Sequence, residues 1–238
     1  MIDIHCHLLY GVDDGAETPE ESVAMLKEAK KQGITAIILT PHYRHGMFPY
    51  NGEKILNHYE RIRPVAQELG IQLYLGTEYH VNSSIVDYLR KGRCLTLAGT
   101  RYVLTEYAYA TEYAYIEKMT QELILQGFTP VIAHVERYDC MRRNPDCVRK
   151  IRNAGALIQI NCDGVLGLQG WKEKRYCNKL LREGYVDYIA SDSHRMEGRV
   201  CNMLKCYEYV SKKYGQDLAQ KLMRDNQSKI LNGEKMQF

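Results

Sequence analysis

The sequence lacks the long apolar run and the leader pattern that mark membrane-inserted or exported chains. Its longest apolar run extends from Ile34 to Leu39 and is interrupted by Thr35, so it is far too short to cross a bilayer. No basic segment followed by an apolar one precedes the first strand-like residues after Met1. We therefore expect no direct membrane insertion and a cytoplasmic location.

The sequence also lacks paired cysteines and strong charge. None of the eight cysteines forms a C-x-x-C pair, and we expect them to remain reduced. None has an arginine at the sixth following position, which argues against a cysteine-nucleophile phosphatase with its phosphate-binding loop. The net charge of +3 is too small for a nucleic-acid coat, and no basic stripe is interleaved with aromatics. No nucleic-acid partner is expected.

The composition is that of a globular protein, with 45% hydrophobic and 26% charged residues. No stretch of the chain resembles a linker, and we expect one domain over residues 1–238.

Seven short apolar segments are predicted to be β-strands, and helical segments separate them. The segment 34–40 is nearly all apolar and rich in β-branched residues, as expected for a strand buried on both faces of a parallel sheet. Thr18, Pro19 and Glu21 predict the start of the first helix, and Gly33 predicts its end. The other predicted strands are 1–7, 71–76, 102–106, 129–133, 156–161 and 186–190.

This alternation favours an α/β fold with a closed or nearly closed parallel barrel. Right-handed crossovers place the carboxyl end of every strand at one rim, where the chemistry of such barrels lies. A doubly wound open sheet has the same alternation, but it gathers its ligands at one switch point.

Six of the seven predicted strands end in or just before a histidine or an acidic residue. Residues two apart in a strand point to the same side, so His5 and His7 can reach one ion. Glu78 and Glu106 follow buried strands, a costly position for carboxylates without a ligand or ion-pair role. The candidate metal ligands are His5, His7, Asp14, His42, Glu78, Glu106, His134, Asp192 and His194.

Each candidate also has a plainer interpretation. The His-x-His pattern occurs in unrelated proteins, Asp14 alone is typical of a turn, and His42 alone is typical of a loop. Five imidazoles and four carboxylates together are too many for one ion that needs three or four protein ligands, so two or three divalent ions are expected. This mixture of nitrogen and oxygen ligands suits Mn, Fe or Zn, and such a centre could hold an anion.

The ordered set of motifs resembles the polymerase-and-histidinol-phosphatase (PHP) superfamily. Within it, the chain is most similar to the bacterial protein-tyrosine phosphatases of capsular and exopolysaccharide operons. The motifs are His5-x-His7, Asp13-Asp14-Gly15, Thr40-Pro41-His42, Gly76-Thr77-Glu78, the strand ending in Glu106, Ile132-Ala133-His134-Val135-Glu136-Arg137 and Ala190-Ser191-Asp192-Ser193-His194.

The resemblance implies a distorted (β/α)7 barrel of the PHP type with a trinuclear, typically manganese-dependent centre at its rim. It implies that Arg137 and Arg199 bind phosphate, although they could instead pair with Glu136 and Glu197. The implied substrate is phosphotyrosine on a bacterial tyrosine autokinase, a membrane-associated partner that regulates capsule or exopolysaccharide synthesis. The tyrosine-rich segment 107–115 departs from the expected pattern.

We hypothesise in-line attack by a metal-activated water, without a covalent enzyme intermediate. Arg44, His45 and Arg195 lie beside candidate ligands and could attract an acidic phosphopeptide, or they could be solvated loop charges. Three alternatives stay open: a small-molecule phosphomonoesterase of the histidinol-phosphate type, a PHP-type phosphodiesterase or exonuclease, and a metal-stabilised binding module.

Overall fold

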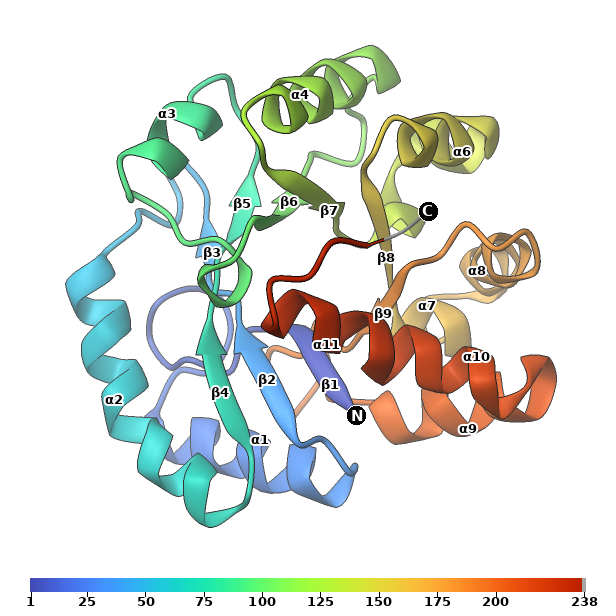
Figure 1. Ribbon diagram of the computed structural model, residues 1–238. Helices are drawn as coiled ribbons and strands as arrows, with labels where there is room; N and C mark the ends of the chain where they lie inside the picture. The colour runs from blue at the N-terminus through green and yellow to red at the C-terminus, as the bar shows by residue number, and fades with distance from the viewer. Residues whose placement is uncertain (237–238) are drawn as a thin grey trace.

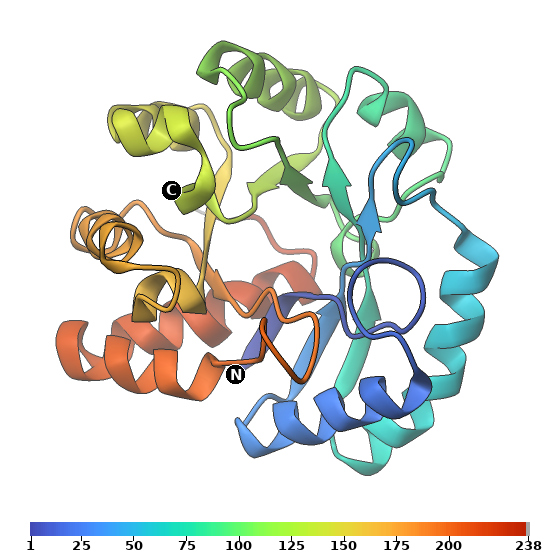
Figure 2. The ribbon, with the colours of Figure 1, turned by 180° about the vertical axis from the view of Figure 1, so that it is seen from behind.

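Parallel strands curl around a common centre, and helices surround them (Figures 1 and 2). The computed structural model describes residues 1–236; residues 237 and 238 of the predicted domain lie outside this part. The strands are β1 (Ile2–Cys6), β2 (Ala36–Leu39), β3 (His42–Tyr43), β4 (Gln72–Leu75), β5 (Glu78–His80), β6 (Tyr102–Glu106), β7 (Thr129–Ile132), β8 (Leu157–Asn161) and β9 (Tyr188–Ala190). The helices are α1 (Pro19–Lys31), α2 (Gly52–Glu68), α3 (Ile85–Arg90), α4 (Tyr113–Leu125), α5 (Asp139–Arg143), α6 (Asp146–Asn153), α7 (Cys162–Leu166), α8 (Trp171–Arg182), α9 (Met203–Tyr214), α10 (Gln216–Gln220) and α11 (Asn226–Leu231).

All seven predicted strands are present, but the described residues hold nine strands because two short ones were not predicted. The strands form two sheets, ordered β1-β2-β4 and β3-β5-β6-β7-β8-β9. Pro41 separates β2 from β3, and Gly76 separates β4 from β5. A Cβ on Gly76 would come within 2.9 Å of the buried Leu97 side chain and within 3.1 Å of Ile38, so this close packing favours glycine. The chain therefore changes sheets at Pro41 and Gly76.

The ring is completed where β9 meets β1. Cys6 forms an isolated parallel bridge with Ser193, and the backbone N–H of Asp192 donates to the carbonyl of His5 (2.9 Å). The two sheets thus form the distorted parallel barrel that the alternation and the resemblance predicted, and this fold prediction is confirmed.

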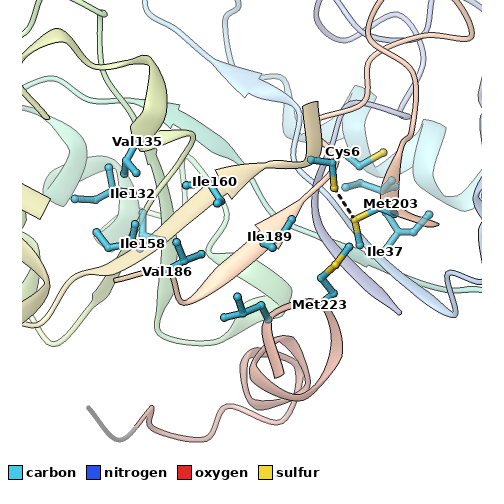
Figure 3. Packing of buried hydrophobic residues seen from close by; sticks show 14 of the residues in the cluster. Cys6, Ile37, Ile132, Val135, Ile158, Ile160, Val186, Ile189, Met203 and Met223 are labelled. Atoms are coloured by element: carbon cyan, nitrogen blue, oxygen red, sulfur yellow. Dashed lines mark hydrogen bonds between the residues drawn. The ribbon is translucent and has the colours of Figure 1, made fainter. Parts of the chain in front are cut away.

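Side-chain alternation along the strands divides the buried apolar residues into two clusters. The outer cluster lies between strands and helices and includes Ile37, Ile132, Ile158 and Ile189 (Figure 3). The inner cluster fills the barrel with side chains one position away, namely Ile2, Ile4, Ala36, Ile38, Leu97, Tyr102, Leu104, Val131, Ala133, Leu157, Tyr188, Ala190 and Ile230. Strands such as β1, β2 and β8 are therefore buried on both faces, as their apolar composition predicts, whereas Gln72 of β4 is exposed.

The opposite end of the barrel is covered by the C-terminal part of the chain. Ile230 of α11 belongs to the inner cluster, and the hydroxyl of Tyr102 contacts the backbone of Glu234 and Met236. Because Tyr102 begins β6, this contact lies at the amino ends of the strands. The C-terminal segment therefore leaves the opposite rim, at the carboxyl ends of the strands, open for polar side chains.

Three other predictions can be compared with the structure. Thr18 caps α1 by accepting from the backbone N–H of Glu21 (3.2 Å), as predicted, but the Glu21 carboxylate accepts from Glu17 and not from the cap residue. All eight cysteines are free. Within residues 1–236, no helix combines the length and the apolar character that a bilayer crossing requires.

Candidate metal centre

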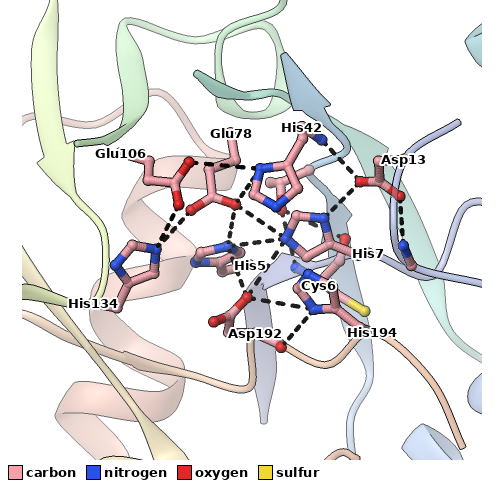
Figure 4. Close-up of polar contacts among 12 residues, drawn as sticks. His5, Cys6, His7, Asp13, His42, Glu78, Glu106, His134, Asp192 and His194 are labelled. Atoms are coloured by element: carbon pink, nitrogen blue, oxygen red, sulfur yellow. Dashed lines mark hydrogen bonds and ion pairs between the residues drawn. The ribbon is translucent and has the colours of Figure 1, made fainter. Parts of the chain in front are cut away.

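The predicted ligands gather at the carboxyl ends of the strands (Figure 4). Nitrogen and oxygen atoms of eight of them form three groups, within each of which all ligand atoms lie within 4.8 Å of one another. The groups are His7, Asp14, His42 and His194; His5, His7, Glu78 and Asp192; and His42, Glu78 and Glu106. Because His7, His42 and Glu78 each belong to two groups, the three groups form one continuous cluster.

His5 and His7 point to the same side, as the strand geometry predicts. Their Nε2 atoms are 3.2 Å apart, and both lie close to Oε2 of Glu78, at 3.0 and 3.1 Å. The pairing of β1 with β2 is irregular between Asp3 and Cys6. Ile2 and Ile4 belong to the inner cluster and Cys6 to the outer one, so this irregularity shifts the alternation and turns both imidazoles inward.

The two unpredicted strands carry ligands of the centre. β3 and β5 pair in register so that His42 lies opposite Glu78, and Nδ1 of His42 is 3.1 Å from Oε2 of Glu78. Glu106 ends the neighbouring strand β6, and its Oε2 is 3.8 Å from the same nitrogen. The breaks at Pro41 and Gly76 therefore lead directly into ligand positions.

His134 and Asp192 follow β7 and β9 in a left-handed backbone conformation, with φ of 34° and 53°. Such values cost free energy in residues other than glycine, and they cluster at functional sites. His134 is not part of the three groups, but its Nε2 lies 2.9 Å from Oε1 of Glu78. His194 approaches Asp14 from the other side, with 3.5 Å between Nε2 and Oδ1. All nine candidates thus meet at one rim.

Four polar residues that were not predicted to act in the site form hydrogen bonds with candidate ligands. Oδ2 of Asp13 lies 2.7 Å from Nδ1 of His7 and accepts from the backbone N–H of His42. His80 lies 3.1 Å from Oε2 of Glu106. Gln159 and Asn161 of β8 contact His5 and Asp192. Asn161 ends a strand at the same rim, and this position was the one signal that could have drawn attention to it.

Charges within the cluster shift pKa values in the directions that metal binding requires, with two exceptions, His5 and His7. Burial would lower the pKa of His5, but Glu78 and Asp192 raise it above its usual value. Burial acts to raise the pKa of Glu78, but His5 and His42 hold that pKa well below its usual range. Burial and the charge of His7 lower the pKa of His194 to about 4. Burial would also lower the pKa of His7, but Asp13 and Glu78 raise it to about 10. Metal binding must therefore displace a proton from His7.

The residues present fit divalent cations. Oε2 of Glu78, Oδ1 of Asp192 and Nε2 of His194 are buried and have no hydrogen-bond partner. Buried polar atoms are otherwise almost always paired. The nearest polar neighbours of these three atoms are other candidate ligands, at 3.0–3.5 Å, so a cation between them would give all three a partner. Imidazole nitrogens and carboxylate oxygens are the ligand types of Mn, Fe and Zn.

A pocket of about 220 Å³ opens over the cluster and contains further polar and aromatic side chains. Arg137 and Arg199 line it, and both pair with Oδ2 of Asp192 (3.0 and 2.7 Å) rather than with Glu136 or Glu197. Their pairing with a candidate ligand keeps both guanidinium groups beside the cluster. The remaining lining residues are Asp14, His42, Arg44, Met47, Phe48, Glu106, Tyr109 and His134.

The other predicted basic residues and the tyrosine-rich segment have different positions. Arg195 pairs with Glu17 and Glu21 (2.7 and 3.3 Å), and His45 is exposed. Tyr107 is buried with its ring edge-on to Tyr138, whereas Tyr109 is 56% exposed and lines the pocket.

The parallel barrel and the imidazoles and carboxylates at its rim define a protein of the PHP type. The sequence model of one family, described as "Capsular polysaccharide synthesis, CpsB/CapC", matches residues 1–232. The chain belongs to the CpsB/CapC family. The resemblance inferred from the motifs is thereby confirmed.

The chain is also similar to proteins named tyrosine-protein phosphatases. It is 36% identical to the tyrosine-protein phosphatase CpsB of Streptococcus pneumoniae. The alignment of the two has 238 positions and covers 97% of this chain and 98% of the relative. The chain is 30% identical to the tyrosine-protein phosphatase YwqE of Bacillus subtilis, over 92% of this chain and 87% of the relative.

Solved structures agree with these relationships. Crystal structures of YwqE and CpsB, described as metal-dependent tyrosine phosphatases, include one that matches with a TM-score of 0.91 and 29% identity, covering 100% of this chain and 96% of that chain. A β-aspartyl dipeptidase of Fervidobacterium islandicum AW-1 matches at a TM-score of 0.61 and 10% identity, over 98% of this chain and 74% of its own. That second likeness concerns the fold alone.

The position of Glu78 in two of the groups predicts that its replacement weakens metal binding. At Mn²⁺ concentrations near 100 times Kd, binding should stabilise the parent protein by about 2.7 kcal/mol. For a chain of this size, that corresponds to a rise in Tm of roughly 5–10 °C. In Glu78→Gln, the rise should fall to less than half, as measured by calorimetry with and without Mn²⁺. Glu60→Gln, an exposed partner of Arg63 on α2, is the control. Equal rises in both variants would contradict the assignment.

Proposed function

We propose that this protein is a metal-dependent phosphatase that hydrolyses phosphotyrosine on proteins, with residues 1–238 acting as one catalytic domain. The observation that supports this proposal most strongly is the placement of two arginines beside a cluster of imidazoles and carboxylates with unpaired buried ligand atoms. The names of the relatives support the substrate class.

We further propose that the nine candidate ligands hold two or three divalent ions, and that these ions are manganese, with iron or zinc as alternatives. When bound, such ions supply positive charge that polarises phosphoryl oxygens and allows water to act as the nucleophile at neutral pH. The side chains that would hold them are His5, His7, Asp14, His42, Glu78, Glu106, His134, Asp192 and His194.

The residues of the chain itself account for the positioning of the substrate. Arg137 is largely buried and Arg199 is partly exposed at the pocket, and each contacts Asp192 through one terminal nitrogen. The remaining N–H groups of a guanidinium can bind phosphate oxygens in a planar, two-pronged geometry. We propose that both arginines bind the phosphoryl group while Asp192 fixes their orientation.

The aromatic side chains at the pocket suit the ring of a tyrosine. Phe48 stacks on His42 with 5.5 Å between ring centroids and 10° between planes, and Tyr109 stands exposed among the residues that line the same pocket. Aromatic pairs contribute about 0.5–1.5 kcal/mol beyond their buried area. These rings would favour an aryl phosphate over an alkyl phosphate. The partly exposed Arg44 beside them suits an acidic peptide.

Membership in a capsule-synthesis family supports a specific protein substrate. We propose that it is a bacterial tyrosine autokinase, associated with the membrane, that regulates capsule or exopolysaccharide synthesis. The proposed location of the phosphatase is the cytoplasm, where such a kinase domain would be accessible.

Substrate preference tests this function directly. With Mn²⁺ present, the purified protein should release phosphate from a phosphotyrosine peptide with a kcat/KM about 5–150-fold higher than from histidinol phosphate. In histidinol phosphate an alkyl carbon replaces the phenyl ring next to the phosphate, so contacts with Phe48 and Tyr109, of about 0.5–1.5 kcal/mol each, are lost. It should not cleave a single-stranded oligonucleotide, and chelation should abolish its activity. A preference for histidinol phosphate would support the small-molecule alternative, and oligonucleotide cleavage would support the exonuclease. If none of these substrates is hydrolysed, the result would support the metal-stabilised binding module.

Replacement of Arg137 by lysine tests the phosphate-binding role. A charged hydrogen bond contributes about 1.5–3 kcal/mol, so Arg137→Lys should lower kcat/KM on a phosphotyrosine peptide by about 10–100-fold. Tm should change little, because a cation remains beside Asp192. Arg149→Lys, at an exposed pair with Asp146 on α6, is the matched control. Unchanged kinetics in Arg137→Lys would remove this residue from the site.

A further inference from the structure

Strand β8 ends at the metal centre without contributing any of the nine candidate ligands. Its neighbours β7 and β9 lead into His134 and Asp192. The side chains of β8 at this level are Gln159 and Asn161, which are 0% and 2% exposed. Burying an amide is costly unless its oxygen and its NH2 group are both hydrogen-bonded. These two amides therefore have to be explained by their partners.

The partners form a continuous chain of hydrogen bonds between two ligands. Oε1 of Gln159 accepts from the backbone N–H of His134 (3.0 Å) and lies 3.1 Å from Nδ1 of His5. Nε2 of Gln159 donates to Oδ1 of Asn161 (2.7 Å), and Nδ2 of Asn161 donates to Oδ2 of Asp192 (2.7 Å). We call these two residues the amide relay.

The partners of the relay fix the orientation of both side-chain amides. A backbone N–H can only donate, so His134 requires the oxygen of Gln159 to face it. The NH2 group of Gln159 then faces Asn161, whose own NH2 group is left for Asp192. At the other end, the oxygen of Gln159 can only accept, so Nδ1 of His5 carries the hydrogen. The Nε2 atom of His5 is the one that faces the cluster.

At Asp192 the relay helps to give the two carboxylate oxygens different partners. Oδ2 accepts from Asn161, Arg137 and Arg199, at 2.7, 3.0 and 2.7 Å. Oδ1 has no hydrogen-bond partner and lies 3.3 Å from Nε2 of His5 and 3.5 Å from Nε2 of His7. One oxygen thus anchors the arginines, and the other is available to a cation.

We propose that Gln159 and Asn161 are positioning residues, which orient His5 and Asp192 so that Nε2 of the imidazole and Oδ1 of the carboxylate face the same ion. The inference rests on the metal centre of the proposed function but not on its substrate. Partners of this kind behind metal ligands typically change metal affinity by about 10–100-fold when they are replaced.

A purely structural role predicts something different. If the two amides only satisfied one another in the interior, their replacement would lower Tm without a specific effect on metal binding. Asn226 provides the comparison, because it is also 2% exposed and donates through Nδ2 to a buried acceptor, the carbonyl of Asp187 (2.8 Å). It belongs to α11, which lies toward the opposite end of the barrel.

The test measures Mn²⁺ affinity of the full-length, metal-stripped protein by calorimetric titration, together with Tm in chelator. Asn161→Asp keeps the shape but places a carboxylate against Oδ2 of Asp192, and it should weaken Mn²⁺ binding by about 10–100-fold. Gln159→Met removes the oxygen and the NH2 group of Gln159 while keeping a side chain of similar length, and it provides a second variant if the first does not fold. Asn226→Ala should lower Tm and leave Mn²⁺ affinity unchanged.

A double variant tests whether the two residues act as a unit. Gln159→Glu forces Asn161 to reverse its amide and to turn its oxygen toward Asp192, so the single change should weaken Mn²⁺ binding. In the background of Asn161→Ala there is no amide to reverse, and Gln159→Glu should have a clearly smaller effect there. Additive effects, parent-like affinity in the folded relay variants, or an equal loss of affinity in Asn226→Ala would each overturn the proposal.

These outcomes are distinct from failure of the proposed function. If the parent protein binds Mn²⁺ but hydrolyses no phosphotyrosine peptide, the function is wrong and the relay is still tested by affinity. If it hydrolyses the peptide while the relay variants bind Mn²⁺ as the parent does, the relay is wrong and the function stands. A parent protein that binds no Mn²⁺ would overturn both.

Discussion

The meeting of His5 and His7 is the constraint on which the rest of the structure depends. Each ring has its Nδ1 atom against an oxygen acceptor, Gln159 for His5 and Asp13 for His7, and each points Nε2 at the other across 3.2 Å. Oε2 of Glu78 lies about equally close to both nitrogens. Lone pairs at such distances repel one another unless positive charge lies between them. Protons can supply that charge, and divalent cations, with their higher charge, can supply more of it. At this rim, the barrel holds electron-pair donors close together despite their mutual repulsion.

The barrel achieves this through local departures from regular strand geometry. The irregularity in β1 turns two imidazoles inward, the breaks at Pro41 and Gly76 lead into β3 and β5, and His134 and Asp192 adopt left-handed backbone angles. Regular strands fill the barrel below with apolar side chains, whereas these irregular positions lie at the level of the ligands. The stability of the packed core thus supports the strained backbone at the site, a division that is common in enzymes.

Much of this arrangement could be predicted from the sequence, because strands such as β1, β2 and β8 are buried on both faces and form distinct runs of mainly apolar residues. The ligands could be predicted because they follow those runs, and carboxyl ends of parallel strands share one rim. The short strands β3 and β5 could not be predicted, since the break at Gly76 depends on Leu97, a neighbour that is distant in sequence. The same holds for His80, Gln159 and Asn161, whose roles depend on contacts across the barrel. Neutral amides also carry no signal of metal chemistry. Arg137 and Arg199 were predicted to bind phosphate or to pair with nearby glutamates, and their shared partner Asp192 became visible only in three dimensions.

A phosphatase built in this way joins the cluster, the two arginines and the aromatic pocket through single side chains. Asp192 presents one oxygen to the candidate ligand cluster and the other to both arginines, so the proposed metal and phosphate sites share one carboxylate. The most direct test of the central claim is anomalous X-ray diffraction from crystals of the protein grown with Mn²⁺. We predict anomalous peaks within the three ligand groups, including one in contact with Nε2 of both His5 and His7. The absence of peaks at this rim, or peaks confined to other surfaces, would contradict the claim.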